Sequence, residues 1–242
     1  MSQQGRVDRQ AAFILHAQPY RETSLLVEAL TRDHGRFSLV ARGARRPRAD
    51  LRGVLLPFQP LTLSWFGKGE LRTLHTADWN GGVRPLSGLP LVCGFYLNEL
   101  MMKLTARDDP EPRAFSVYDD AVRGLSRLGA QGAVLRRYEL RLMQALGYAP
   151  SLLRDSQGEA IHPERGYWCR GASLPEPDEG QIVADGARLT GACLLAIEAD
   201  DYALPATRQQ ARALTRLWLT HLLGREPLAS RELLQAIQAI AE

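Results

Sequence analysis

Cysteine is scarce, with three in 242 residues. They stand far apart in the sequence, at Cys93, Cys169 and Cys193. An odd, dispersed set does not form the disulfide framework of a small secreted domain. Long apolar runs are also missing, because residues 89–104, the most apolar stretch, include three polar or charged side chains. Residues 1–10 are polar and lack the apolar centre of a secretory signal. We therefore expect a cytoplasmic protein with no membrane partner.

Common catalytic signatures are missing as well. The sequence contains no GxxxxGK[ST], GxGxxG, GxSxG or HExxH pattern. Its five histidines are dispersed, and adjacent acids at 108–109, 119–120 and 200–201 suit helix starts or solvated loops. No spacing among them predicts a two-metal centre. We therefore expect no enzymatic activity, with a metal-dependent nuclease that uses the paired acids as an alternative.

A structural zinc site is not predicted either. Such a site needs about four Cys or His ligands, usually in CxxC pairs. The loop-rich segment 151–190 offers only His162 and Cys169. We expect this segment to be metal-free and the protein to need no cofactor.

The first eighty residues read as short strands. Apolar and polar side chains alternate in five segments, 11–17, 24–30, 36–43, 60–66 and 70–77. Gly35 suits a turn with positive φ, and residues 67–69, Gly-Lys-Gly, suit a hairpin. Five short strands in this length predict an OB-type Greek-key barrel, although an SH3-like barrel gives a similar pattern.

From residue 86 the apolar period becomes helical. Helical patterns cover residues 89–104, 114–129, 133–150, 190–199, 206–224 and 230–242. Residues 151–190 break this pattern with glycine, proline and charge, and we expect about two short strands there. The predicted class is α+β, with an OB-fold domain at 1–80, a helical domain in two parts at 81–150 and 191–242, and a small insert at 151–190.

Positive charge is concentrated near the N-terminus. Residues 1–76 contain 12 Lys and Arg against 6 Asp and Glu, whereas the whole chain has a net charge of only +3. The densest stretch, ARGARRPRADLRG at 41–53, holds five arginines and one acid. Like charges this close repel one another unless an anion is near, so the stretch favours a polyanion-binding loop over a merely solvated one.

This charge pattern gives a candidate nucleic-acid-binding set and candidate stacking aromatics. The cations are Arg36, Arg42, Arg45, Arg46, Arg48, Arg52, Lys68 and Arg72. The aromatics of the same module are Tyr20, Phe58, Trp65 and Phe66, of which we expect Trp65 to belong to the core. No feature reads specific bases, so binding without sequence preference is expected.

The motifs SLLVEALT, HGR and VARGAR, followed by YLNEL and LRRYEL…LGY, resemble the RecO family of bacterial DNA repair proteins. The resemblance extends over nearly the whole chain. It implies an N-terminal OB-fold, then a helical domain with a zinc-ribbon-like insert. It also implies binding of single- and double-stranded DNA, annealing of complementary strands, and no bond-breaking chemistry. Some members carry four zinc-binding cysteines in the insert, where this chain keeps only Cys169.

The resemblance also implies protein partners. These are the C-terminal tail of single-stranded-DNA-binding protein, RecR and, indirectly, RecA, in a nucleoid-associated setting. An acidic, apolar tail requires cations beside apolar surface. We assign it to Arg136, Arg137, Tyr138 and Arg141, although the same residues also fit a bundle helix with a solvated basic face. An RNA-binding barrel protein remains an alternative, because a basic loop does not separate RNA from DNA.

Overall fold

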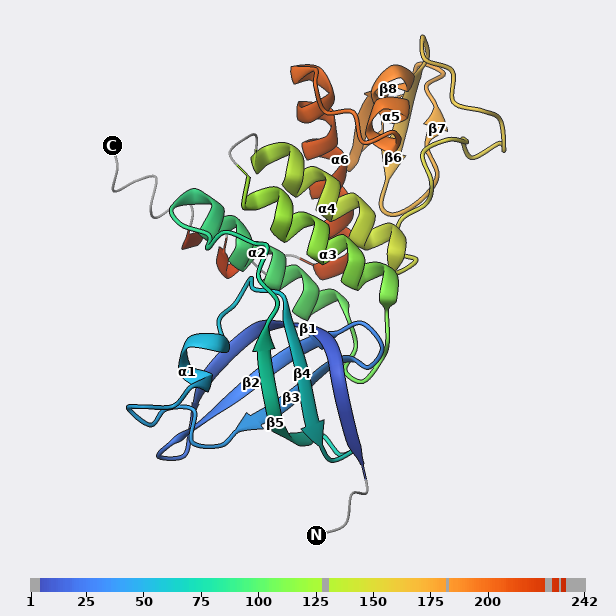
Figure 1. The fold of residues 1–242 in the computed structure, drawn as a ribbon. Coiled ribbons are helices and arrows are strands. Elements are labelled where there is room, and N and C mark those ends of the chain that lie inside the picture. The colour runs from blue at the N-terminus through green and yellow to red at the C-terminus, as the bar shows by residue number, and fades with distance from the viewer. Residues whose placement is uncertain (1–4, 128–130, 182, 225–227, 231, 234–242) are drawn as a thin grey trace. The chain divides into compact units, whose positions relative to one another are not determined.

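Five strands close into a barrel in the order β1-β2-β3-β5-β4 (Figure 1). A computed structural model describes residues 5–127, 131–181, 183–224, 228–230 and 232–233. The strands are β1 (Arg6–Tyr20), β2 (Ser24–Thr31), β3 (Gly35–Ala41), β4 (Leu61–Phe66) and β5 (Leu71–Trp79). Neighbouring strands are antiparallel except β3 and β5, which run parallel, and β1 closes the barrel against β4. The predicted OB-type barrel is confirmed, and every predicted strand segment lies on one of these strands.

The barrel interior holds the side chains that the alternating pattern places on one face. Ile14, Val27, Leu39, Leu61 and Trp65 are among its fully buried members. Burying such side chains stabilises the fold by about 1.5–3 kcal/mol each. Trp65 is a core residue, as predicted.

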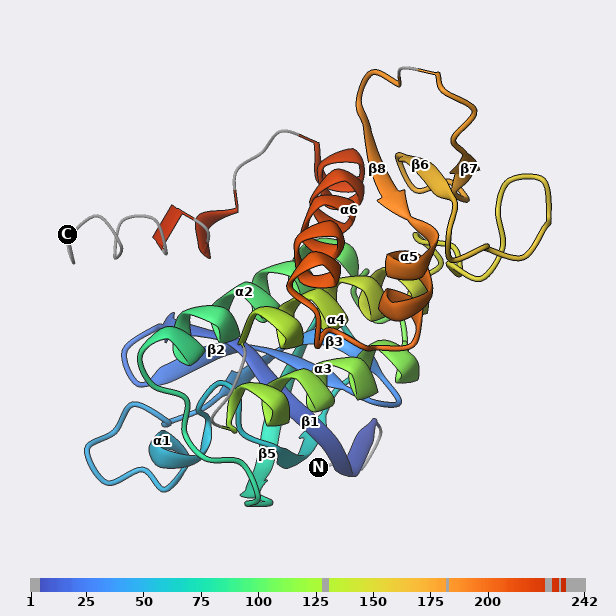
Figure 2. The same ribbon diagram turned by 90° about the horizontal axis from the view of Figure 1, so that it is seen from above.

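Two helices pack on the barrel and belong to the same compact unit, which comprises residues 1–128 and 229–242. They are α2 (Leu89–Leu104) and α3 (Pro112–Leu125). Figure 2 looks down on both helices with strands beneath them. The Phe13 ring of β1 lies 5.0 Å from the Tyr118 ring, and the Asn98 side chain donates a hydrogen bond of 2.6 Å to the Leu15 carbonyl. The sequence pattern changes near residue 80, where a domain boundary was predicted. These contacts nevertheless join α2 and α3 to the barrel.

The second compact unit comprises residues 129–228. It contains α4 (Gln131–Ala145), α5 (Gly191–Glu198) and α6 (Pro205–Leu223), together with a sheet of order β7-β6-β8. The sheet strands are β6 (Gly166–Arg170), β7 (Glu176–Pro177) and β8 (Gly186–Thr190). The described residues of the insert thus form three strands instead of the two predicted, because the short β7 carries no alternating pattern.

The helix predicted at 230–242 falls largely on residues 231 and 234–242, outside the described part. Among the described residues, no helix is both long enough and apolar enough to cross a bilayer.

Candidate nucleic-acid interface

The basic loop after β3 is attached to the barrel by apolar side chains. Ala44 and Leu55 are buried in the barrel core, and Leu51 and Val54 pack against it. Between them the chain forms tight turns and a short helix, α1 (Leu51–Val54), which the sequence pattern did not predict. The loop therefore presents its arginines from an anchored backbone.

Three of these arginines surround an open hollow of about 660 Å³. Arg42, Arg46 and Arg48 line it together with Asp50, the one acid in its wall. All three side chains are exposed, as are Arg45 and Arg52. Within the described residues, none of the five lies within 4.0 Å of a carboxylate oxygen. The loop therefore carries uncompensated positive charge, which suits a polyanion.

Arg45 also fastens the loop to the β1–β2 turn. Its backbone N–H donates to the Thr23 carbonyl at 2.9 Å, and its guanidinium donates to the Arg21 and Glu22 carbonyls at 3.3 Å. Arg21 is exposed, and its guanidinium carbon lies 5.3 Å from the centre of the Tyr20 ring. This pairing adds Arg21 and Tyr20 to the same surface. Sequence reasoning did not include Arg21, which lies 24 positions before Arg45.

Arg36 lies away from this surface, in a buried network. Its guanidinium is paired with Glu28 at 2.5 Å and donates to the Thr105 carbonyl at 2.7 Å, and its side chain is 12% exposed. Glu28 also accepts from Ser38 at 2.8 Å and from Arg107 at 3.1 Å. The Arg36 charge is thus compensated inside the fold.

Arg72 and Lys68 are also separate from the loop. The Arg72 side chain, 11% exposed, is paired with Asp108 at 2.5 Å and lies 3.8 Å from the Phe37 ring centre. Lys68 is exposed in the β4–β5 turn. Because β5 runs parallel to β3 and starts beside Ser38, this turn lies at the end of the barrel where β3 begins (Figure 1). The structure therefore brings together five of the eight predicted cations.

The candidate aromatics divide in a similar way. Phe58 is buried like Trp65, while Phe66 is half-buried at the end of β4 beside His75, with ring centres 4.9 Å apart. Sequence reasoning missed Trp79, which is 60% exposed at the end of β5. Alternation along a strand does not show whether the side chain at the end of the strand is covered by other parts of the fold.

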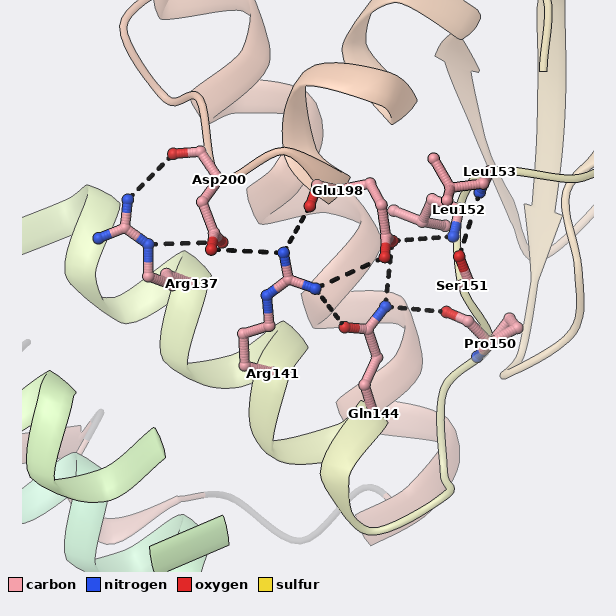
Figure 3. Close-up of polar contacts among 9 residues, drawn as sticks. All are labelled: Arg137, Arg141, Gln144, Pro150, Ser151, Leu152, Leu153, Glu198 and Asp200. Carbon is pink, nitrogen blue, oxygen red and sulfur yellow. Dashed lines mark hydrogen bonds and ion pairs between the residues drawn. The ribbon is translucent and has the colours of Figure 1, made fainter. Parts of the chain in front are cut away.

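The residues assigned to the partner tail do not share one surface. Tyr138 is buried, and Arg136 pairs with the buried Glu139 at 2.8 Å and donates to Thr215 at 3.2 Å. Figure 3 shows Arg137 and Arg141, one turn apart on α4, directed at α5 and the residues after it. Arg137 lies 3.4 Å from Asp200, and Arg141 lies 3.3 Å from Asp200 and 3.5 Å from Glu198. All three guanidinium groups therefore have acidic neighbours in their own unit.

The insert offers one cysteine, Cys169, and one histidine, His162, as candidate zinc ligands. Cys169 is buried in β6, and burial together with the nearby Glu176 carboxylate raises the pKa of its thiol to about 12. With no metal ion bound, this environment favours the neutral thiol over the thiolate that zinc coordinates. In the described ranges no cluster of three or more His, Cys, Asp or Glu side chains has the arrangement of a metal site.

Comparison with known proteins assigns the chain. The family model described as "Recombination protein O N terminal" matches residues 5–82, and "Recombination protein O C terminal" matches residues 87–232. The chain belongs to the RecO family. The boundary between the two models falls just before α2, close to the predicted boundary at residue 80.

Relatives support this membership over the full length. The DNA repair protein RecO of Chromobacterium violaceum is 72% identical over 245 residues, covering 100% of both chains. That of Laribacter hongkongensis is 50% identical with the same coverage, and that of an Azoarcus species is 46% identical over 98% of this chain and 99% of the relative. The names of these relatives and family models describe proteins of DNA repair and recombination. This chain aligns with them from the barrel through the helical region.

Proposed function

We propose that this RecO family member is a non-enzymatic mediator that binds single- and double-stranded DNA and anneals complementary strands. The observation that carries the proposal is the hollow lined by Arg42, Arg46 and Arg48, three exposed cations against the single acid Asp50. Phosphates spaced along a strand are the natural counter-charge for such a surface. Phosphates are common to every sequence, so the expected binding is independent of sequence.

Annealing follows from the same charge. Two complementary strands repel each other through their phosphates, and a surface that neutralises both lowers this repulsion while base pairing supplies the free energy. The chemistry needs no nucleophile, metal or cofactor.

The loop is tested by the triple variant Arg42→Ala, Arg46→Ala, Arg48→Ala. We expect DNA affinity to fall by at least about tenfold in fluorescence anisotropy, because three phosphate contacts are lost. A matched control removes the same charge from exposed arginines of the second unit, Arg165, Arg212 and Arg216. Equal weakening in both variants would show that net charge, and not the loop, determines binding. Competition by RNA of the same sequence separates a DNA-binding from an RNA-binding role.

The proposed partners are the tail of single-stranded-DNA-binding protein, RecR and, indirectly, RecA. Family membership supports them, and α4 supplies a basis for tail binding. Arg137 is half-exposed and donates to the Asp200 carbonyl at 3.0 Å, but its distance to the Asp200 carboxylate is 3.4 Å. This exposed ion pair is worth little, so a tail carboxylate can exchange with that of Asp200. We propose that Arg141 binds the tail beside Arg137, and that Arg136 and Tyr138 support these two residues on α4.

Tail binding is tested by pull-down of single-stranded-DNA-binding protein with and without its C-terminal tail. We expect capture to depend on the tail and to fall in Arg137→Ala, while Arg165→Ala, an exposed arginine of the same unit, captures normally. Capture that is indifferent to the tail would contradict the assignment.

A further inference from the structure

A second hollow, of about 420 Å³, lies beside α1 in the barrel unit. We call it the α1–β5 groove. Its walls are mainly apolar and come from α1, the segment before β4, the end of β5 and the first turns of α2. Its principal lining residues are Val54, Leu56, Phe58, Trp79, Leu86 and Phe95. Leu56, Trp79 and Phe95 are exposed, which is unusual for large apolar side chains that adjoin one another.

The floor of the groove is held rigidly by Phe58. This residue is buried although its φ is +63°, a left-handed conformation that costs a bulky residue free energy. Its ring meets the Phe95 ring edge-on, with centres 5.4 Å apart. Gly94 permits this packing, because a Cβ there would lie 2.9 Å from the Phe58 ring. The groove is therefore a shaped aromatic surface.

Trp79 is fixed in orientation while most of it stays in solvent. Its indole N–H donates to the Gln59 side-chain oxygen at 3.0 Å, and Gln59 itself is buried. The hydrogen bond directs the ring, and 60% of the residue remains accessible. An oriented, exposed indole is the arrangement that stacks flat aromatic ligands at little entropic cost.

The groove adjoins the cationic loop across helix α1. Leu51 of α1 lines the hollow of Arg42, Arg46 and Arg48, while Gly53 and Val54 of the same helix line the groove. The exposed Arg52 stands between them in sequence. One four-residue helix thus separates a phosphate-binding surface from an apolar, aromatic one. A ligand that occupies both must alternate anionic and flat apolar groups.

We propose that the α1–β5 groove receives an unpaired nucleobase of single-stranded DNA, stacked on Trp79, while the loop arginines hold the adjoining phosphates. The inference rests on the proposed function, because it takes DNA as the ligand of the loop. It adds a reason for preferring unpaired strands, since a base in a duplex is already stacked and paired. It also predicts that binding does not depend on the base sequence of the DNA, because every base has a stacking face.

The test compares a thymidine oligonucleotide with an abasic oligonucleotide of the same length, which keeps the phosphates and lacks the bases. We expect the wild-type protein to bind the thymidine strand at least about fivefold more tightly. Trp79→Ala should abolish this preference while keeping the affinity for the abasic strand and for duplex DNA. Trp79→Phe, which keeps an aromatic ring, should retain most of the preference.

Leu204→Ala serves as a matched control, because Leu204 is an exposed apolar residue of the other unit. Circular dichroism and the melting temperature verify that each variant is folded. Equal wild-type binding of the two strands, or a preference that survives in Trp79→Ala, overturns the groove proposal and leaves phosphate binding by the loop intact. Failure of the wild-type protein to bind the abasic strand or duplex overturns the proposed function of the loop instead.

Discussion

Position 35 places two requirements on its residue, and among the amino acids only glycine meets both. Its φ is +66°, and a Cβ at this position would lie 2.2 Å from the Asp109 carbonyl oxygen. The first requirement belongs to the β2–β3 turn, and the second comes from the segment after α2. Gly158 shares only the first, because its φ is +85° and the space around it is open.

We predict that Gly35→Ala lowers the free energy of unfolding by at least about 3 kcal/mol, from backbone strain plus a clash with main-chain atoms. Gly158→Ala should cost only about 1 kcal/mol, because strain alone applies. Urea denaturation of the two variants measures both. Equal costs would mean that the segment at Asp109 moves aside freely.

Arg36 is a further residue whose position decides its role. Its guanidinium compensates the buried carboxylate of Glu28 and is largely shielded from solvent. Breaking this pair leaves the poorly solvated Glu28 carboxylate with only the more exposed Arg107 as a cationic partner, and this is more costly than losing an exposed contact.

We predict that Arg36→Ala destabilises the protein by about 3 kcal/mol while DNA affinity, measured on the folded protein, changes less than about twofold. Arg48→Ala should do the reverse, weakening binding with stability unchanged within about 0.5 kcal/mol. Urea denaturation and anisotropy on both variants separate the roles. Strong loss of affinity in folded Arg36→Ala would place this residue at the interface after all.

At element scale, the second unit is joined by a polar network around Glu198 of α5 (Figure 3). Its carboxylate accepts from Gln144 of α4 at 3.1 Å and from the Leu152 backbone N–H at 2.9 Å. Arg141 donates to the Glu198 carbonyl at 2.5 Å. One side chain thus links α4, α5 and the start of the insert, which are distant in sequence.

We predict that Glu198→Ala lowers the stability of this unit by about 2 kcal/mol, because several donors lose a shared acceptor. The Leu152 amide should then exchange with deuterium faster than in the wild type. Glu179→Ala, which removes an exposed carboxylate of the insert, is the control and should leave both measurements unchanged. An unaltered Leu152 exchange rate would show that the network contributes little.

At the scale of the whole molecule, charge is distributed unevenly along the chain. The first 76 residues have six more cationic than anionic side chains, although the net charge of the chain is +3. The helical region is acidic enough to pair many of its own arginines, as at Arg137 and Arg141. The barrel loop gathers five exposed arginines between residues 42 and 52.

We predict that this distribution appears in the salt dependence of DNA binding. For the triple variant Arg42→Ala, Arg46→Ala, Arg48→Ala, the slope of log K against log salt should become shallower by about two, because three contacts to a single strand release fewer counterions. The control triple at Arg165, Arg212 and Arg216 should keep the wild-type slope. Equal slopes for the wild type, the loop variant and the control variant would contradict phosphate binding by the loop arginines.

Much of the fold was predictable from local pattern. Alternation along the strands and the change to helical spacing near residue 86 depend on neighbouring residues only, and each gave the right element. The strand β7 and the helix α1 are too short for a periodic pattern of apolar side chains to be detected in the sequence. The candidate site was predictable only as a set of charges, since sequence does not say which arginine has an acid beside it.

Side-chain period and local charge were enough to predict a small β-barrel, a set of helices and a group of arginines between residues 41 and 53. Which of the cations stay free depends on the tertiary structure. Folding placed Glu28 beside Arg36 and Asp108 beside Arg72, while it left Arg42, Arg46 and Arg48 around an open hollow. It also set Trp79 beside Gln59 and Phe58, 20 positions or more away along the chain. Charge compensation and exposure depend on contacts between distant segments, and only the closed fold creates those contacts.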